Sequence, residues 1–220
     1  MIIGRFFRFM DIIKSIDVNY RLFGLKGVCT LPIKVRRGIK IGTLERNSVE
    51  VSNNCKRFMI KMGYNGSPFV DYRREYLSIL GGKIKFDGSC TIAEGFSIFV
   101  NGGTLQFGDG IFINRNVLIQ CEDEIKIGKD VLIGWNINIR DTDGHQIKKN
   151  GELSDEKKPI FIDNSTWIAS DCTILKGTRI SKNCVVGCNS LLCGQQFEEE
   201  KSLIVGSPAK KIRGEIEWKN

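Results

Sequence analysis

The sequence offers one histidine for acid–base chemistry. His145 ends the stretch DTDGH, residues 141–145, and it is the single histidine among 220 residues. A neutral imidazole accepts a proton near pH 7, and a carboxylate bonded to its N–H would fix the tautomer and stabilise the imidazolium. His145 is therefore the first candidate for acid–base chemistry, with Asp141 and Asp143 as candidate partners. The alternative is a surface histidine with no chemical role, beside solvated loop charges.

Eight cysteines offer thiol chemistry but no metal site. They form no CxxC pair and no cluster with histidine, and one histidine cannot supply the three ligands of a zinc carbonic anhydrase, so we expect no metal. A thiol nucleophile would require Cys121 or Cys193 beside a base, and His145 is the only base available. The apolar N-terminus is interrupted by charges and is neither an export signal nor a membrane span, so we expect reduced thiols and a cytoplasmic protein.

The segments that carry these residues follow a repeat of six. Between Ile84 and Leu192, apolar residues recur every six positions in five groups of three. This period fits neither a helix nor an alternating strand, but it fits a chain that turns a corner every six residues and points one side chain inward per face. Three faces make one triangular coil, and stacked coils bury a continuous core. We therefore predict a parallel β-helix with the ladder residues Phe86, Ile92, Ile98, Phe107, Ile113, Ile119, Ile127, Ile133, Ile139, Ile162, Ile168, Ile174, Ile180, Val186 and Leu192.

Small residues and one long insertion mark the corners of this solenoid. Glycine often follows a ladder residue, and Asn or Asp often comes three residues after it; both tolerate the positive φ angles of tight corners. The spacing from Ile139 to Ile162 far exceeds six, so residues 140–159 must leave the coil as a loop. Loops on rigid scaffolds often carry function, and His145 lies near the start of this one. The corner residues are Gly108, Gly128, Gly134, Gly187, Asn116, Asp130, Asn136, Asp171, Asn183 and Asn189.

The two ends of the chain depart from the repeat. Residues 5–24 carry an apolar stripe at helical spacing, formed by Phe6, Phe9, Ile13 and Ile16. We predict that residues 1–25 form a helical cap over the open end of the solenoid, that residues 26–213 form the β-helix domain, and that residues 214–220 form a tail. The alternative for residues 1–20 is weak contact with a membrane surface, which the net charge of +8 also permits. No basic helix with interleaved aromatic residues is present, so no nucleic-acid partner is expected.

Four features together define a family resemblance. They are the hexapeptide ladder, DTDGH, TWIASDCTILKGTRI at residues 166–180 and VGSPAKKIR at residues 205–213. Over roughly residues 84–213 the chain resembles the left-handed β-helix, hexapeptide-repeat acyltransferases, in particular sugar O-acetyltransferases of the galactoside and maltose type. The resemblance implies an all-β left-handed parallel β-helix, a homotrimer and acetyl-CoA as co-substrate between two subunits. It also implies that His145 is the general base that takes a proton from a saccharide hydroxyl. In many relatives a backbone carbonyl holds the imidazole, and in this sequence Asp143 is the candidate for that part of the site.

The resemblance assigns binding residues as well. Asn114 offers both a donor and an acceptor for a hydroxyl pair. Glu122 stands where the family has an Asp that binds the acceptor, and its extra methylene leaves the acceptor's identity open. The structural alternative for Asn114 is a residue that only forms the corner. The structural alternative for Trp167 is an aromatic residue that packs between subunits. The residues implied to hold coenzyme A are Gly134, Trp167, Ser170 and Cys188 along the pantetheine arm and Lys210, Lys211 and Arg213 near the phosphates.

Two other functions remain open at this stage. N-acylation of a nucleotide-linked amino sugar uses the same fold and a similar histidine. A non-catalytic β-helix scaffold would not account for a loop histidine and a basic tail in one chain. We therefore expect O-acetylation of a saccharide or glycan precursor, with N-acylation as the alternative.

Overall fold

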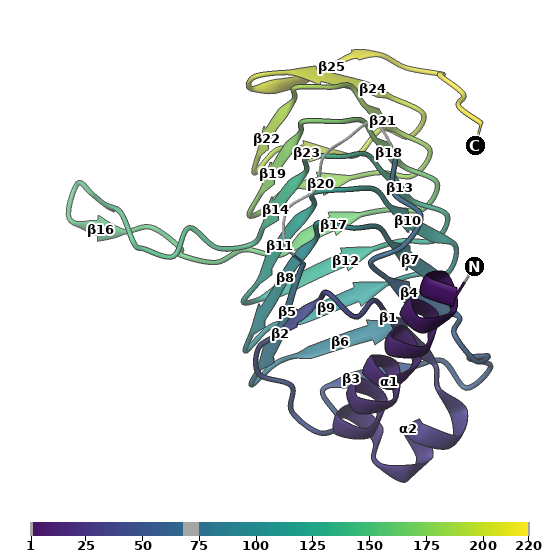
Figure 1. Ribbon diagram of the computed structural model, residues 1–220. Helices are drawn as coiled ribbons and strands as arrows, with labels where there is room; N and C mark the ends of the chain where they lie inside the picture. Colours follow the sequence, from purple (N-terminus) through teal and green to yellow (C-terminus); the bar gives the residue numbers. More distant parts are fainter. Residues whose placement is uncertain (1, 68–74, 220) are drawn as a thin grey trace.

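The chain forms a three-sided solenoid in which successive strands pass from one sheet to the next. A computed structural model describes residues 2–67 and 75–219. Each coil contributes one strand to sheet A, one to sheet B and one to sheet C, and neighbouring coils pair in parallel (Figure 1). The predicted left-handed parallel β-helix is confirmed, and the sequence before Ile84, where the repeat is weak, also forms coils.

The strands of each sheet follow one another at intervals of one coil. Sheet A contains β1 (Ile33–Val35), β4 (Ile60–Met62), β7 (Cys90–Ile92), β10 (Ile111–Ile113), β13 (Leu132–Ile133), β18 (Trp167–Ile168), β21 (Val185–Val186), β24 (Leu203–Gly206) and β25 (Ala209–Arg213). Sheet B contains β2 (Lys40–Ile41), β5 (Tyr76–Leu80), β8 (Ser97–Asn101), β11 (Leu118–Cys121), β14 (Asn138–Arg140), β19 (Thr173–Leu175) and β22 (Leu191–Cys193). Sheet C contains β3 (Val49–Val51), β6 (Lys83–Phe86), β9 (Thr104–Phe107), β12 (Glu124–Ile127), β17 (Ile160–Ile162), β20 (Arg179–Ile180) and β23 (Gln196–Phe197).

The predicted ladder residues form the core. Every one of them is at most 2 % exposed. They also pair in register from coil to coil: on sheet A, for example, Ile113 lies opposite Ile92 on one side and Ile133 on the other. Phe86 and Phe107 stack with ring centroids 5.1 Å apart. The apolar core is therefore continuous along the solenoid, as the repeat predicts.

The corners use two kinds of residue for different reasons. All six predicted Asn and Asp corner positions have positive φ. The glycines that follow ladder residues have another role, because none of them has positive φ. A Cβ at Gly108 would lie 2.6 Å from the backbone of Gly128 in the next coil. These glycines therefore permit close stacking of neighbouring coils, which corrects our expectation that they serve the turn itself.

Two helices lie across the first coil. Helices α1 (Ile2–Phe23) and α2 (Leu25–Thr30) precede β1. The face of α1 that packs on β1 is partly polar: backbone N–H groups of Ile33 and Val35 donate to the side chains of Asn19 (3.2 Å) and Ser15 (2.9 Å). The Asn19 amide donates in return to the Ile33 carbonyl at 2.6 Å. Four residues of helix advance about 6 Å and two residues of strand about 6.7 Å, so the two spacings match.

The predicted apolar stripe of α1 faces outward, contrary to our expectation. Phe9 is 59 % exposed, Ile13 45 % and Ile16 37 %. The strand edge presents N–H and C=O groups, and these are satisfied by polar side chains rather than by apolar ones. The side chain of Phe6 lies outside the described part of the structure. No described helix is long and apolar enough to cross a membrane.

Candidate active site

Five of the predicted binding residues line one groove on the solenoid. Asn114, Gly134, Trp167, Ser170 and Cys188 border a volume of about 600 Å³ along sheet A and the corner that leads from sheet A to sheet B. All but Trp167 come one or two residues after a core-facing residue of sheet A. Strand pairing stacks these core-facing residues, Ile113, Ile133, Ile168 and Val186, directly above one another. The repeat itself therefore places these residues in one row.

The floor of this groove is built from small residues. A Cβ at Gly134 would lie 2.9 Å from the backbone nitrogen of Ser170, so only glycine fits between the coils. Ala169 and Gly187 border the same groove. A thin, extended ligand can therefore approach the backbone closely here.

Trp167 lines the groove, and its ring also contacts the C-terminal tail. Its ring lies 6.0 Å from that of Trp218, at an angle of 42°. The indole N–H of Trp218 donates to the carbonyl of Ser165 at 2.8 Å, which fixes the tail against the solenoid. Trp135 also lines the groove. Trp135 was not predicted as a site residue. Trp218, which lies outside the repeat, does not line the groove itself but contacts Trp167.

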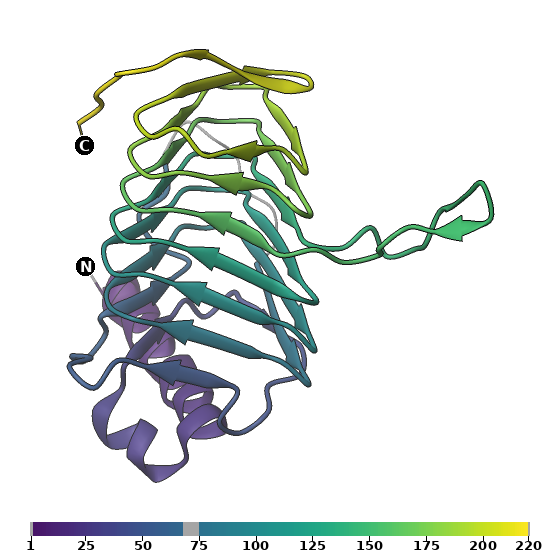
Figure 2. The ribbon, with the colours of Figure 1, turned by 180° about the vertical axis from the view of Figure 1, so that it is seen from behind.

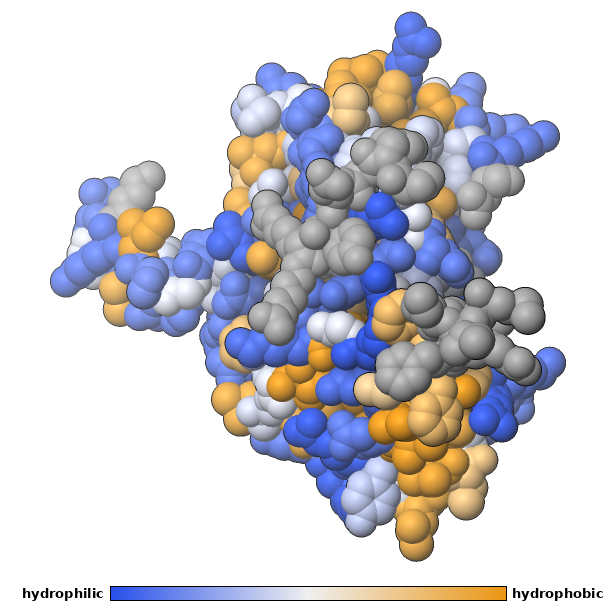
Figure 3. Space-filling model, viewed as in Figure 1, coloured by the Kyte–Doolittle hydropathy of each residue, from blue (hydrophilic) through white to orange (hydrophobic). Residues whose placement is uncertain are grey.

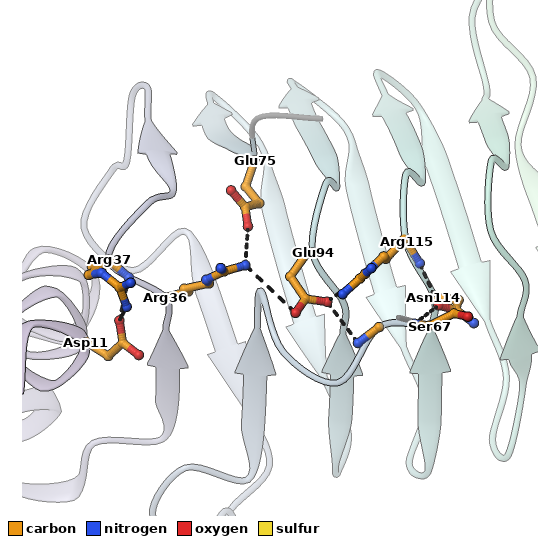
Figure 4. Close-up of polar contacts among 9 residues, drawn as sticks. Asp11, Arg36, Arg37, Ser67, Glu75, Glu94, Asn114 and Arg115 are labelled. Atoms are coloured by element: carbon orange, nitrogen blue, oxygen red, sulfur yellow. Dashed lines mark hydrogen bonds and ion pairs between the residues drawn. The ribbon is translucent and has the colours of Figure 1, made fainter. Parts of the chain in front are cut away.

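The side-chain amide of Asn114 is fixed at one end. Its Oδ1 accepts the backbone N–H groups of Arg115 (2.9 Å) and Ser67 (3.0 Å) (Figure 4). Ser67 belongs to a segment that leaves the solenoid after β4. The amide oxygen is therefore already engaged, which corrects our expectation that Asn114 offers a donor and an acceptor together.

His145 lies on a loop that projects far from the solenoid. The loop leaves after β14 and returns at β17, and it carries the short hairpin of β15 (Lys148–Lys149) and β16 (Glu152–Leu153) (Figures 1 and 2). His145 is exposed, and no hydrogen bond to its ring is found within the described residues. The carboxylate of Asp143 instead pairs with Lys176 at 2.6 Å.

The base of the loop is held by Asp141. This side chain is 0 % exposed, and its two oxygens accept the backbone N–H groups of Glu122 and Asp123 at 2.8 Å each. Burial raises the pKa of the Asp141 carboxyl, although these two hydrogen bonds oppose the shift. Asp141 therefore ties the start of the loop to the turn that contains Glu122.

Glu122 lies beside the loop rather than in the groove. Its carboxylate pairs with Lys157 at 3.1 Å and accepts a hydrogen bond from Gln120 at 2.9 Å. Asn114 lies at the corner before strand β11, whereas Glu122 directly follows the end of that strand. Within one chain, the groove thus lies at the corner where sheet B begins, and the His145 loop lies at the corner where sheet B ends.

The three predicted cations lie on the last strand. Lys210, Lys211 and Arg213 are exposed on β25, which pairs antiparallel with β24. Lys211 pairs with Glu199. Lys210 and Arg213 have no ion pair with any described residue.

The cysteines do not assemble a second reactive centre. Cys121 is fully buried, and burial raises the pKa of its thiol, so it is a core residue. Cys188 and Cys193 are exposed and unbridged. No group of three or more potential metal ligands is found within residues 2–67 and 75–219.

Comparison with known proteins identifies the relatives of this chain. No protein-family model matches it. It is 32 % identical over 108 residues to galactoside O-acetyltransferase of Lactococcus lactis, a match that covers 47 % of this chain and 51 % of that protein. It is 29 % identical over 133 residues to polysialic acid O-acetyltransferase of Neisseria meningitidis, which covers 60 % and 56 %. The chain spans about half the length of the curated relatives it matches.

A solved structure extends the similarity to the fold. A hexapeptide-repeat acetyltransferase of Vibrio cholerae, complexed with acetyl coenzyme A, is 27 % identical with a TM-score of 0.50; the match covers 62 % of this chain and 72 % of that one. The predicted resemblance to hexapeptide-repeat acyltransferases is confirmed.

Proposed function

We propose that the chain is an acetyl-CoA-dependent O-acetyltransferase that acts on a hydroxyl group of a saccharide or glycan precursor. The observation that carries this proposal is the groove of small residues, in which Gly134, Ser170 and Cys188 leave room for a thin pantetheine arm. The acetyl coenzyme A in the Vibrio cholerae relative and the names of the two O-acetyltransferase relatives support it. The need for acetyl-CoA and the eight unbridged thiols support a cytoplasmic location.

In the proposed reaction, His145 acts as general base. Its imidazole takes the proton of the acceptor hydroxyl while that oxygen attacks the thioester carbonyl carbon. The carbon–sulfur bond breaks, the CoA thiolate leaves and takes up the proton, and an ester forms on the saccharide. Asp143 would orient the imidazole once the acceptor and acetyl-CoA close the site. Lys210, Lys211 and Arg213 would bind the phosphates of coenzyme A.

A homotrimer supports this chemistry better than a single chain. The groove and the His145 loop lie at the two opposite corners that flank sheet B. The loop of one subunit would therefore reach the groove of the next. Glu122 and Asn114 would then meet the acceptor from two subunits. In this assembly residues 26–213 form the acyltransferase domain, residues 1–25 its N-terminal cap and residues 214–220 its tail.

The test is release of free CoA thiol with sugars, nucleotide sugars and amino sugars as acceptors. We expect His145→Ala to lower acetyl transfer about 10²–10⁴-fold, the usual contribution of a positioned general base. The neighbouring exposed Gln146→Ala is the matched control and should retain the parent rate. A His145→Ala variant as active as the parent would refute the base assignment, and transfer to amino sugars alone would favour N-acylation.

We also propose that α1 contacts an anionic membrane surface. Its outward face is largely apolar (Figure 3), with Phe9, Ile13 and Tyr20 each more than 40 % exposed, and it also carries the exposed Asp17. Lys14 and Arg21 on the same helix and Lys26 on α2 flank this face, so charge and apolar contact act together.

Sedimentation with phosphatidylserine-containing and purely phosphatidylcholine vesicles tests this contact. We expect binding to the anionic vesicles, and we expect Phe9→Ser combined with Ile13→Ser to abolish it. Ile147→Ser removes an exposed isoleucine from the distant loop and serves as the control. No vesicle binding, or concentration-dependent association through α1 without lipid, would overturn the proposal.

A further inference from the structure

A short segment after β4 crosses the corner next to the groove. We call residues 63–67 the strap. The strap makes hydrogen bonds with the next two coils. The N–H of Gly63 donates to the Ile92 carbonyl at 2.7 Å and that of Gly66 donates to the Glu94 carboxylate at 2.8 Å, both in the following coil. The N–H of Ser67 donates to Asn114 Oδ1 at 3.0 Å, one coil further on. Three successive coils are therefore joined by one segment at the groove's N-terminal end (Figure 4).

A network of charges holds the strap in place. The Glu94 carboxylate pairs with Arg115 Nε at 3.2 Å and, through its other oxygen, with the Arg36 guanidinium at 3.8 Å. Arg36 also pairs with Glu75 at 3.4 Å. Burial by itself would raise the pKa of Glu94, but hydrogen bonds from the backbone N–H groups of Glu94 and Gly66 and from Arg115 outweigh it, so the pKa is lowered. The strap thus rests on an ionised carboxylate.

The fit of the strap requires glycine at position 66. A Cβ there would lie 2.4 Å from both Arg115 Cγ and Glu94 Oε2. A larger residue would therefore displace either the strap or the ion pair beneath it. Gly38 provides a contrast, because a Cβ there would meet only Glu75 Oε2, at 3.8 Å.

The strap decides which part of Asn114 reaches the groove. An amide oxygen has two lone pairs, and the N–H groups of Ser67 and Arg115 use both. Only an oxygen can accept two N–H groups, so the amide cannot rotate end for end without losing both bonds. Figure 4 shows the amide nitrogen turned away from Ser67, toward the later coils that line the groove.

We infer that the strap is a positioning element that presents Asn114 to the acceptor as a hydrogen-bond donor only. The site would then select acceptors with an oxygen lone pair at this point, such as a hydroxyl or amide carbonyl oxygen, and reject those that can only donate. This inference rests on the proposed acetyltransferase function. Gly66 and Glu94 act through Asn114, whereas Asn114 itself touches the acceptor.

The experiment compares Asn114→Asp, Gly66→Ala and their double variant, with Gly38→Ala as control. Aspartate keeps the oxygens that accept the strap but replaces the donor with an acceptor. We expect Asn114→Asp to lower kcat/KM for the acceptor by roughly ten- to a hundredfold while the Kd for coenzyme A stays constant, because unpaired polar groups in a site discriminate strongly. Gly66→Ala should lower kcat/KM in the same direction.

The double variant distinguishes positioning from general damage. If the strap acts through Asn114, the double variant should lose no more than Asn114→Asp alone. Multiplicative losses, or full activity of Asn114→Asp, would overturn the inference. Hydrogen exchange of the strap gives a second readout: the amide of Ser67 should stay protected in Asn114→Asp and lose protection in Asn114→Ala, whereas the amide of Gly63, which donates to Ile92, should change less.

The exchange measurement also separates two kinds of failure. A parent protein that transfers acetyl groups to no acceptor in the panel, yet shows the expected protection pattern, would overturn the proposed function and the acceptor preference while leaving the strap contact supported. If the parent protein is active but the strap amides exchange without protection, the strap contact with Asn114 would be overturned while the proposed function would stand.

Discussion

The two aspartates of the DTDGH motif should respond to very different extents to the same substitution. Asp141 is completely buried and accepts two backbone N–H groups, whereas the side chain of Asp143 is 35 % exposed and pairs with Lys176. Replacing either by Asn removes one charge and changes the side-chain shape very little. The comparison therefore isolates what each carboxylate does.

The magnitude follows from the contacts. In Asp141→Asn one oxygen still accepts a backbone N–H, but the new NH₂ faces the other N–H at the former 2.8 Å distance. Losing a charged hydrogen bond costs about 1.5–3 kcal/mol, and the relief of a buried charge offsets part of it. We expect a net loss of about 1–3 kcal/mol, or a fall in Tm of about 2–10 °C at this chain length. Asp143→Asn removes a partly exposed ion pair and should cost about 1 kcal/mol or less.

Thermal unfolding of both variants, combined with acetyl-transfer kinetics, tests this reasoning. Asp141→Asn should also lower kcat, because the start of the His145 loop is no longer tied to the turn at Glu122. The KM for acetyl-CoA should not change, since none of the residues proposed to bind coenzyme A lies on the loop. Equal Tm values for Asp141→Asn and the parent, or a larger loss in Asp143→Asn, would refute the assignment of Asp141 as the anchor of the loop.

Three further predictions concern the groove and the strap. Trp218→Ala removes the aromatic neighbour of Trp167, a contact worth about 0.5–1.5 kcal/mol; fluorescence titration should show several-fold weaker coenzyme A binding, and unchanged affinity would argue against a role of the tail in holding Trp167. Gly134→Ala places a Cβ 2.9 Å from the backbone of Ser170; urea unfolding should reveal lower stability, and a stable variant with normal binding would contradict the close stacking. The lowered pKa of Glu94 means that its stabilising effect is present above the usual glutamate range of about 4.3 and is lost as pH falls through the lowered value. The stability difference between parent and Glu94→Gln should therefore stay constant from about pH 5 to 8, and a difference that disappears within that window would contradict the ionised contact.

The solenoid could be predicted because its repeat is local. A residue such as Ile133 points inward in any coil of six-residue faces, whatever its neighbours are, and each ladder residue is indeed buried. The row formed by Asn114, Gly134 and Ser170 follows from the same regularity, because equal positions in successive coils stack. The family resemblance named these residues as binding residues, and the repeat explains why they form one row.

The remaining features depend on contacts between distant residues. Ser67 meets Asn114 across 47 positions and Trp218 meets Ser165 across 53, and neither pair belongs to the repeat. The orientation of α1 was predicted wrongly for a similar reason. Helical spacing reveals an apolar stripe, but it cannot reveal that the partner surface is a strand edge that requires Ser15 and Asn19.

This contact between α1 and β1 also closes one end of sheet A. A parallel β-helix ends in strands whose free N–H and C=O groups can recruit another chain and start a fibre. At one end of sheet A, the side chains of Ser15 and Asn19 occupy those groups, and at the other end β25 folds back antiparallel on β24. Sheet A is therefore closed at both ends by contacts within the chain itself, which removes pairing sites that could start end-to-end polymerisation through this sheet.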